Sequence, residues 1–146
     1  MKRIVFLGCE NSHSAMFINF IKNDSQYSDI EIVGVYSCDK EAAEKLAEKY
    51  DVPVLNCYSD AVGKVDGIVV TARHGDNHLK YALPYLSKDM VVFMDKPITV
   101  SESDALEFAK TCIKNGVKVT GGSSCRFVSF VKELKNDAEN KIGGET

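Results

Sequence analysis

The chain has 146 residues, of which 45% are hydrophobic and 27% are charged, with a formal net charge of −3. This composition is ordinary for a globular protein, and the length suits one domain that can bury its own core. Basic residues are dispersed among acidic ones and no apolar run is long enough to cross a membrane, which excludes nucleic-acid-binding and membrane-spanning classes.

Cysteine usage indicates the cellular setting. The five cysteines are odd in number, scattered, and form no Cys-x-x-Cys pair. That pattern argues against a disulfide framework and against a zinc site. The first apolar run, residues 4–8, is too short for the core of a signal peptide. We therefore expect a protein of the reducing cytoplasm without a bound metal.

Apolar runs alternate with helical patterns along the chain. The apolar runs predict strands at residues 4–7, 30–36, 67–71, 91–94 and 117–120, and a weak edge strand at 52–55, where Pro53 would be excluded from a central position. Apolar spacing of helical period predicts helices at 14–22, 40–50, 77–86, 101–115 and 127–140, with Pro84 kinking or ending the third. The fourth has a capping-box-like start at residues 101–104 and a typical C-terminal stop at Asn115-Gly116.

Unbroken apolar strands separated by helices predict the fold class. They are typical of βαβ units whose parallel sheet is covered on both faces. We expect an α/β fold with a doubly wound, Rossmann-like sheet in one domain. A flavodoxin-like or receiver-type domain shares this general architecture and is the alternative. The predicted domain covers residues 1–126, and residues 127–146 would be one further helix and the entry to a missing part.

The first candidate site is the loop 8–13, which follows a strand and precedes a helix, the context of a pyrophosphate site. Its sequence, Gly-Cys-Glu-Asn-Ser-His, is not the Gly-x-Gly-x-x-Gly pattern, because Glu10 and His13 stand at the second and third glycine positions. A carboxylate at Glu10 would repel a pyrophosphate unless it points away. Side chains of Ser12, His13 and Ser14 are candidate donors in place of the lost backbone contacts.

Each residue of this loop also has a purely structural interpretation. Ser12 would then cap the helix, and His13 would be a partly buried residue with satisfied hydrogen bonds. Cys9 is a candidate catalytic thiol because it precedes a helix start, but a packed structural thiol is the favoured interpretation. After the second strand, Asp39 is a candidate acceptor for the adenosine ribose and equally a helix N-cap. Ser37 and Lys40 would tolerate a 2′-phosphate, so NAD and NADP both stay open.

The segment Met94-Asp95-Lys96-Pro97 resembles the Glu-Lys-Pro signature of the Gfo/Idh/MocA oxidoreductases, the glucose–fructose oxidoreductase and inositol dehydrogenase group. Other features match the family in the same order along essentially the whole chain: Thr71, His78, Gly121, Arg126-Phe127 and Ile142-Gly143-Gly144-Glu145. The departures are the first loop, Asp95 in place of Glu, and Arg73-His74 in place of a proline-containing pair.

The resemblance implies an NAD(P)-binding domain of an oxidoreductase that acts on a sugar, polyol or related carbinol. It implies a catalytic role for Lys96 at the reacting oxygen of the substrate. The alternative interpretation, without a function, is that Lys96 is a solvated surface lysine. A cis peptide before Pro97 would aim Lys96 into the cleft. The expected cofactor contacts are Gly8, Asn11, Ser12 and His13 at the pyrophosphate, Ser37, Cys38, Asp39 and Lys40 at the adenosine ribose, Thr71, Ala72, Arg73 and His74 at the nicotinamide ribose, and His78, Asp95, Lys96 and Pro97 nearby.

In this family the proton-transfer residues come from a second domain. The resemblance therefore implies that residues 1–126 are the dinucleotide-binding domain, and that residues 127–146 are a helix and the start of a missing C-terminal substrate domain. It also implies that this chain alone is inactive. It also implies assembly into homo-oligomers through that second domain. The alternative function is a catalytically degenerate binding or regulatory module, which Glu10 in the phosphate loop favours.

Overall fold

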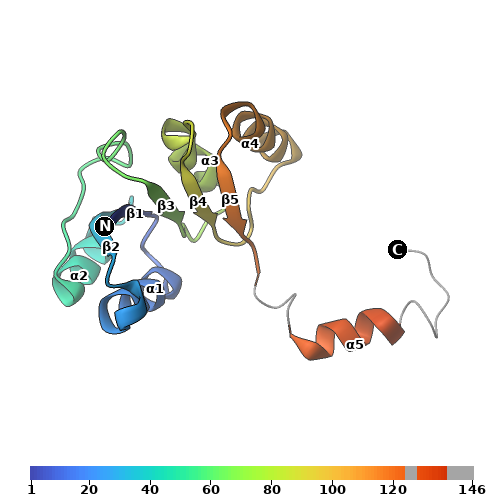
Figure 1. Cartoon of the computed structure of the whole chain (residues 1–146), viewed down its shortest axis with the longest axis horizontal. Coiled ribbons are helices and arrows are strands. Elements are labelled where there is room, and N and C mark those ends of the chain that lie inside the picture. The colour runs from blue at the N-terminus through green and yellow to red at the C-terminus, as the bar shows by residue number, and fades with distance from the viewer. Residues whose placement is uncertain (124–127, 138–146) are drawn as a thin grey trace.

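The computed structural model describes residues 1–123 and 128–137. The Arg126-Phe127 and 142–145 segments of the family resemblance lie outside these described residues. Five parallel strands form one sheet in the order β2-β1-β3-β4-β5 (Figure 1). The strands are β1 (Lys2–Leu7), β2 (Ile30–Tyr36), β3 (Gly67–Val70), β4 (Val91–Met94) and β5 (Lys118–Gly121).

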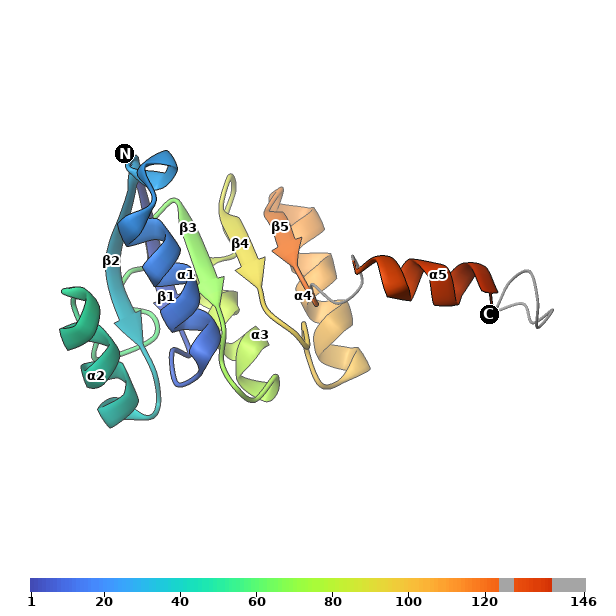
Figure 2. The ribbon, with the colours of Figure 1, turned by 90° about the horizontal axis from the view of Figure 1, so that it is seen from below.

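Helices cover both faces of the sheet, as the doubly wound prediction requires. The α-helices are α1 (Ser12–Asn23), α2 (Lys40–Tyr50), α3 (Asp76–Ala82), α4 (Glu102–Asn115) and α5 (Ser129–Asp137), with short 3₁₀ turns at Ser25–Tyr27 and Leu83–Tyr85. Figure 2 shows α1 and α2 on one side of the sheet and α3 and α4 on the other. The α5 helix lies beyond β5, apart from the sheet (Figures 1 and 2).

Local sequence signals set the helix ends. Ser101 caps α4 by accepting a hydrogen bond from the Asp104 amide, and Gly116 ends it at a positive φ of 68°, both as predicted. The helix α3 is shorter than predicted because Pro84 cannot donate to the helical ladder. It therefore gives way to the 3₁₀ turn at Leu83–Tyr85.

Each face of the sheet has its own apolar core. Phe6 and Ile32 project from the sheet to pack with Ile18 of α1 and Leu46 of α2. On the other face, strand residues pack against Tyr81 of α3 and side chains of α4. Because strand side chains alternate between faces, a strand buried on both sides must be apolar throughout. This explains why unbroken apolar runs predicted the strands.

The predicted edge strand at 52–55 is reduced to a single parallel bridge between Val54 and Val35, at the outer edge of β2. The Val35 amide donates to the Pro53 carbonyl and the Leu55 amide donates to the Val35 carbonyl. Pro53 thus supplies an acceptor and needs no donor, as expected for an edge. If this bridge is counted as a further strand outside β2, the strand order of the sheet matches a Rossmann sheet rather than a flavodoxin-like sheet.

The strand register brings several loops to one edge. Leu7 pairs with Tyr36 and Val70, and Val70 pairs with Met94. The residues that follow these strands therefore lie at the same level along the carboxyl edge. Neighbours on the two sides of β1 are reached by crossovers in opposite directions, which makes this edge a topological switch point. Among the described residues, no helix combines the length and apolar character needed to cross a membrane.

Candidate functional site

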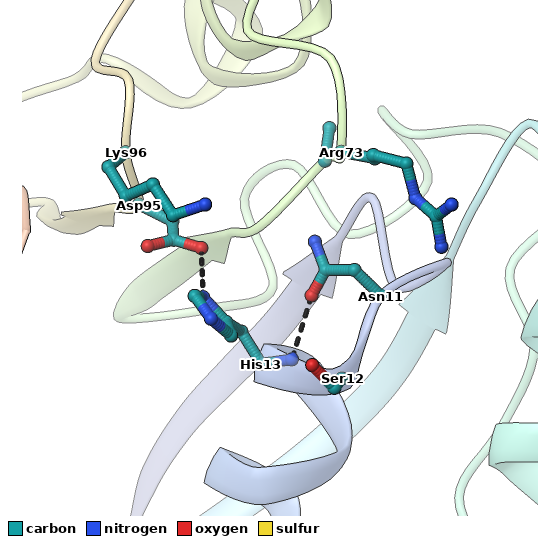
Figure 3. A pocket seen from close by; sticks show the side chains of 7 residues that line it. Asn11, Ser12, His13, Arg73, Asp95 and Lys96 are labelled. Atoms are coloured by element: carbon teal, nitrogen blue, oxygen red, sulfur yellow. Dashed lines mark hydrogen bonds and ion pairs between the residues drawn. The ribbon is translucent and has the colours of Figure 1, made fainter.

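A cavity of about 330 Å³ opens at the carboxyl edge, over the ends of β1, β3 and β4. It is lined by residues from three loops, namely Asn11, Ser12, His13, Ala72, Arg73, Asp95 and Lys96. Figure 3 shows Lys96 reaching toward the middle of the cavity from one side, with Arg73 on the opposite side and the start of α1 below. Residues of the first loop and Lys96 therefore line the same cavity.

Gly8 holds two of these loops in close contact. Its φ is +80°, and a Cβ added there would lie 2.4 Å from the Cα of Ala72. No other residue type meets both requirements, since side chains disfavour this φ and backbone atoms cannot move aside cheaply. The glycine is therefore needed for packing between β1 and β3 as well as for the turn.

Buried hydrogen bonds join α1 to the end of β3. The Oγ1 of Thr71 donates to the Gly8 carbonyl at 3.1 Å and lies 2.5 Å from the Oγ of Ser14. The side-chain Nδ2 of Asn11 donates to the Thr71 carbonyl, and the Oδ1 of Asn11 accepts from the backbone amide of His13 at 2.8 Å. Thr71 and Ser14 have no exposed surface. Their hydroxyls thus connect the loops and do not face the cavity.

Asn11, rather than Ser12, caps α1. The structural interpretation of Ser12 as the cap is therefore wrong: it is the first helical residue, and it is exposed and lines the cavity. An extended N-cap residue aims its side-chain oxygen back at the first turn, and Asn11 has this geometry with φ −128° and ψ 171°. Ser12 is consequently available to a ligand.

The carboxylate of Glu10 points away from the cavity. Its Oε1 accepts from the Arg73 amide at 2.8 Å, and its Oε2 accepts from the Ser37 hydroxyl at 2.7 Å. The Arg73 guanidinium in turn donates to the Glu10 carbonyl at 3.0 Å. The sequence-based objection to Glu10 was repulsion of a pyrophosphate, and this orientation removes it from the cavity lining.

His13 and Asp95 form a close pair on the cavity wall. The Nδ1 of His13 lies 2.5 Å from Oδ2 of Asp95, whose residue is only 5% exposed. Fixing Nδ1 against a carboxylate leaves the other ring nitrogen free to meet a ligand. The peptide bond between Lys96 and Pro97 is cis, as predicted. The Lys96 side chain is exposed and lines the cavity.

The residues predicted at the adenosine ribose do not line this cavity. Asp39 caps α2 by accepting from the Ala42 amide at 3.0 Å, which is the structural alternative proposed for it. Ser37 is buried and holds both Glu10 and the Asp39 amide. Cys38 and Lys40 are exposed beside them. This group lies at the end of β2, on the far side of Glu10 from the cavity.

Three further predicted contacts are also absent from the cavity lining. His78 is fully buried, and its Nε2 donates to the Ala72 carbonyl at 2.9 Å, so it supports the loop from beneath. His74 and Pro97 are exposed near the cavity but not on its wall. Pro97 packs under the β3 loop, where a Cβ added to Gly75 would lie 2.7 Å from its Cγ.

The cavity offers electrostatic attraction, and no thiol from the described part of the chain lines it. The Lys96 ammonium and the positive end of α1 face the cavity, and Arg73 lines its opposite side with its guanidinium turned toward the Glu10 carbonyl. Burial and the nearby Glu10 raise the pKa of the Cys9 thiol to about 12, so Cys9 is a packed structural thiol. No cluster of metal-binding side chains occurs within residues 1–123 and 128–137.

The sequence model of the oxidoreductase family with an NAD-binding Rossmann fold, Gfo/Idh/MocA, matches residues 2–123. The chain belongs to the Gfo/Idh/MocA family. The sequence-based resemblance and the Rossmann-like fold are thereby confirmed, and the chain carries the NAD-binding domain of this family.

Characterised relatives agree with the assignment. Glucose-6-phosphate 3-dehydrogenase of Bacillus subtilis (strain 168) is 27% identical over 139 residues, which are 93% of this chain and 37% of the relative. The myo-inositol dehydrogenase of Lactobacillus casei, solved with NAD(H) and myo-inositol, has a TM-score of 0.75 at 20% identity, over 97% of this chain and 42% of its own. The WlbA dehydrogenase of Bordetella pertussis, solved with NADH and UDP-GlcNAcA, has a TM-score of 0.75 at 21% identity, over 94% and 41%. The chain thus spans well under half the length of these relatives.

The departures from the Gfo/Idh/MocA pattern contact one another in pairs. Glu10 bonds to Arg73, and His13 bonds to Asp95. Sequence reasoning identified each departure separately but missed the pairing, since the partners are 63 and 82 positions apart.

Proposed function

We propose that the cavity holds the pyrophosphate and nicotinamide half of a bound NAD(P), with the adenosine half lying toward the end of β2. The observation that carries this proposal is the convergence of the α1 N-terminus, Arg73 and Lys96 on one cavity at the switch point. This set of groups fits a phosphate, because the α1 N-terminus and Lys96 face the cavity and Arg73 lines it, while Glu10 is turned away.

The cavity volume suits part of the cofactor rather than all of it. About 330 Å³ is at the small end of the range for ligand pockets. The remainder of the dinucleotide would lie along the open carboxyl edge, past Glu10 to the 37–40 segment. This arrangement keeps the predicted contacts at Asn11, Ser12 and His13 and gives Gly8 a supporting role.

The proposed activity of the whole protein is oxidation of a carbinol in a sugar or polyol. The bound dinucleotide would supply the hydride acceptor. The Lys96 ammonium, which projects into the cavity, would donate a hydrogen bond to the reacting oxygen and stabilise negative charge on it. The pair of His13 and Asp95 would hold the neighbouring wall in place. Relatives that act on glucose 6-phosphate and bind myo-inositol support this substrate class.

We further propose that this chain alone does not turn over such substrates, and that residues 127–146 lead into a substrate domain through which the protein forms homo-oligomers. The share of its relatives that the chain spans supports the first part. A cytoplasmic setting is supported by the free thiols of Cys9, Cys38, Cys57 and Cys112.

Titration of NADH into the chain, followed by nicotinamide fluorescence, tests the proposal. We expect micromolar binding, and roughly tenfold weaker binding or more in Arg73→Gln, because a charge-assisted hydrogen bond is lost. Arg3→Gln is the matched control, since Arg3 lies at the amino end of β1 and pairs with Glu31. Absence of binding at millimolar cofactor would instead favour the catalytically degenerate module.

A further inference from the structure

The carboxylate of Glu10 occupies the place where dinucleotide sites usually have an acidic residue. That residue normally stands at the end of the second strand and accepts hydrogen bonds from the adenosine ribose hydroxyls. Here β2 ends at Tyr36, and the next residue, Ser37, donates its hydroxyl to Oε2 of Glu10 at 2.7 Å. A first-loop residue therefore delivers a carboxylate to the end of β2.

The acidic residue that the sequence offers at this strand end is already engaged. Asp39 has an extended backbone and caps α2 through its bond from the Ala42 amide. Its amide also donates to the Ser37 hydroxyl at 3.0 Å, which fixes Asp39 in the capping position. Glu10, in contrast, uses two of the roughly four lone-pair positions of a carboxylate and keeps acceptor capacity.

We propose that Glu10 accepts the adenosine ribose hydroxyls and makes this domain selective for NAD over NADP. The inference rests on the proposed function and adds to it the choice between the two cofactors. It gives a physical reason for an acidic residue at a position where a glycine would allow closer approach of the pyrophosphate.

Charge decides the direction of the selectivity. Both donors to Glu10, the Ser37 hydroxyl and the Arg73 amide, are neutral, and no ion pair found in the described part of the chain includes Glu10. From its partly buried position the carboxylate would therefore repel the additional phosphate of NADP. The Arg73 guanidinium favours a phosphate, but it bonds to the Glu10 carbonyl and so stays beside the opposing carboxylate.

The test compares NADH and NADPH titrations of the intact chain by nicotinamide fluorescence. We expect NADH to bind on the order of tenfold more tightly or better, the effect of one nearby charge at a partly screened site. Glu10→Gln keeps an acceptor for the Arg73 amide and a partner for Ser37, so the fold is retained. We expect that variant to bind the two cofactors with similar affinity.

Two further variants separate the competing explanations. Glu48→Gln removes the same charge from an exposed position on α2 and should leave the preference unchanged. Asp39→Asn keeps a good helix cap and should lower the preference less than Glu10→Gln, because the Asp39 carboxylate is engaged at the start of α2. The inference is overturned if NADPH binds as well as NADH, if Glu10→Gln keeps the preference, or if Asp39→Asn removes it. Failure of the wild-type chain to bind either cofactor would overturn the proposed function itself, and the selectivity with it.

Discussion

Replacing Gly8 with alanine tests how the first loop is held against the β3 loop. The substitution places a side chain at φ +80°, which costs about 1–2 kcal/mol in the left-handed region. The new Cβ also falls 2.4 Å from the Cα and Cβ of Ala72, and such overpacking costs typically a further ~1–3 kcal/mol. We therefore expect the free energy of unfolding to fall by about 2–5 kcal/mol, and the melting temperature by roughly 6–15 °C.

Gly63→Ala is the matched control for this experiment. Gly63 has a φ of +73° but nothing within 4 Å of an added Cβ, so only the backbone term applies. Urea unfolding of both variants, followed by circular dichroism, isolates the contact term of about 1–3 kcal/mol as the difference between them. Equal destabilisation of the two variants would refute the tight packing of Gly8 on Ala72. Loop separation in Gly8→Ala should also weaken NADH binding, whereas Gly63→Ala should not.

Three other predictions follow from buried and hydrogen-bonded groups. Folding raises the pKa of Cys9 from 9.0 to about 12, so the free energy of unfolding should fall as the pH rises above 9, by up to about 1.4 kcal/mol per pH unit. The fall should be shallower in Cys9→Ala, and an identical slope for the two proteins in urea unfolding would contradict this. Thr71→Val should lower the free energy of unfolding by about 1–3 kcal/mol, because it leaves the buried Ser14 hydroxyl unpaired, and Thr71→Ser should lower it less. Equal stability of the two variants would show that the Thr71 hydroxyl does not matter. A hydrogen bond from Ser59 lowers the pKa of Cys57, so iodoacetamide labelling read by mass spectrometry should show a pH midpoint below 9.0 that Ser59→Ala raises; no rise would argue against the bond.

The fold was predictable because its signals are local. Continuous apolar runs identified the buried strands, and Ser101, Gly116 and Pro84 marked helix ends through capping and backbone geometry alone. The weak strand at 52–55 was placed correctly at an edge because Pro53 cannot donate a hydrogen bond. Its reduction to one bridge depends on how far β2 extends beside it, which local sequence does not specify.

The candidate site was only partly predictable, because its key contacts join distant residues. Glu10 read alone suggested repulsion of a phosphate, but the Arg73 amide and the Ser37 hydroxyl turn it aside. His13 and Asp95 read separately were two departures from a family pattern, and together they form one bonded pair. Their register in the sheet, rather than their sequence spacing, brings these groups together.

The sequence also did not distinguish buried residues that support a loop from exposed residues that can contact a cofactor. His78 and Thr71 were expected to contact the cofactor; His78 lies in the first turn of α3, and Thr71 follows β3 directly. Their burial, with bonds to the Ala72 carbonyl and to Ser14, makes them supports for the loop backbone. Only the packing of α3 and α1 against the sheet reveals this difference.

Amide chemical shifts of the ¹⁵N-labelled chain, recorded during an NADH titration, test the central claim most directly. If the ends of β1, β3 and β4 form a nicotinamide-nucleotide site, the largest changes should fall at residues 11–13, 72–73 and 95–96. Changes centred on the opposite edge of the sheet, around Lys2, Asp66 and Met90, would contradict the claim, as would unchanged spectra at millimolar NADH.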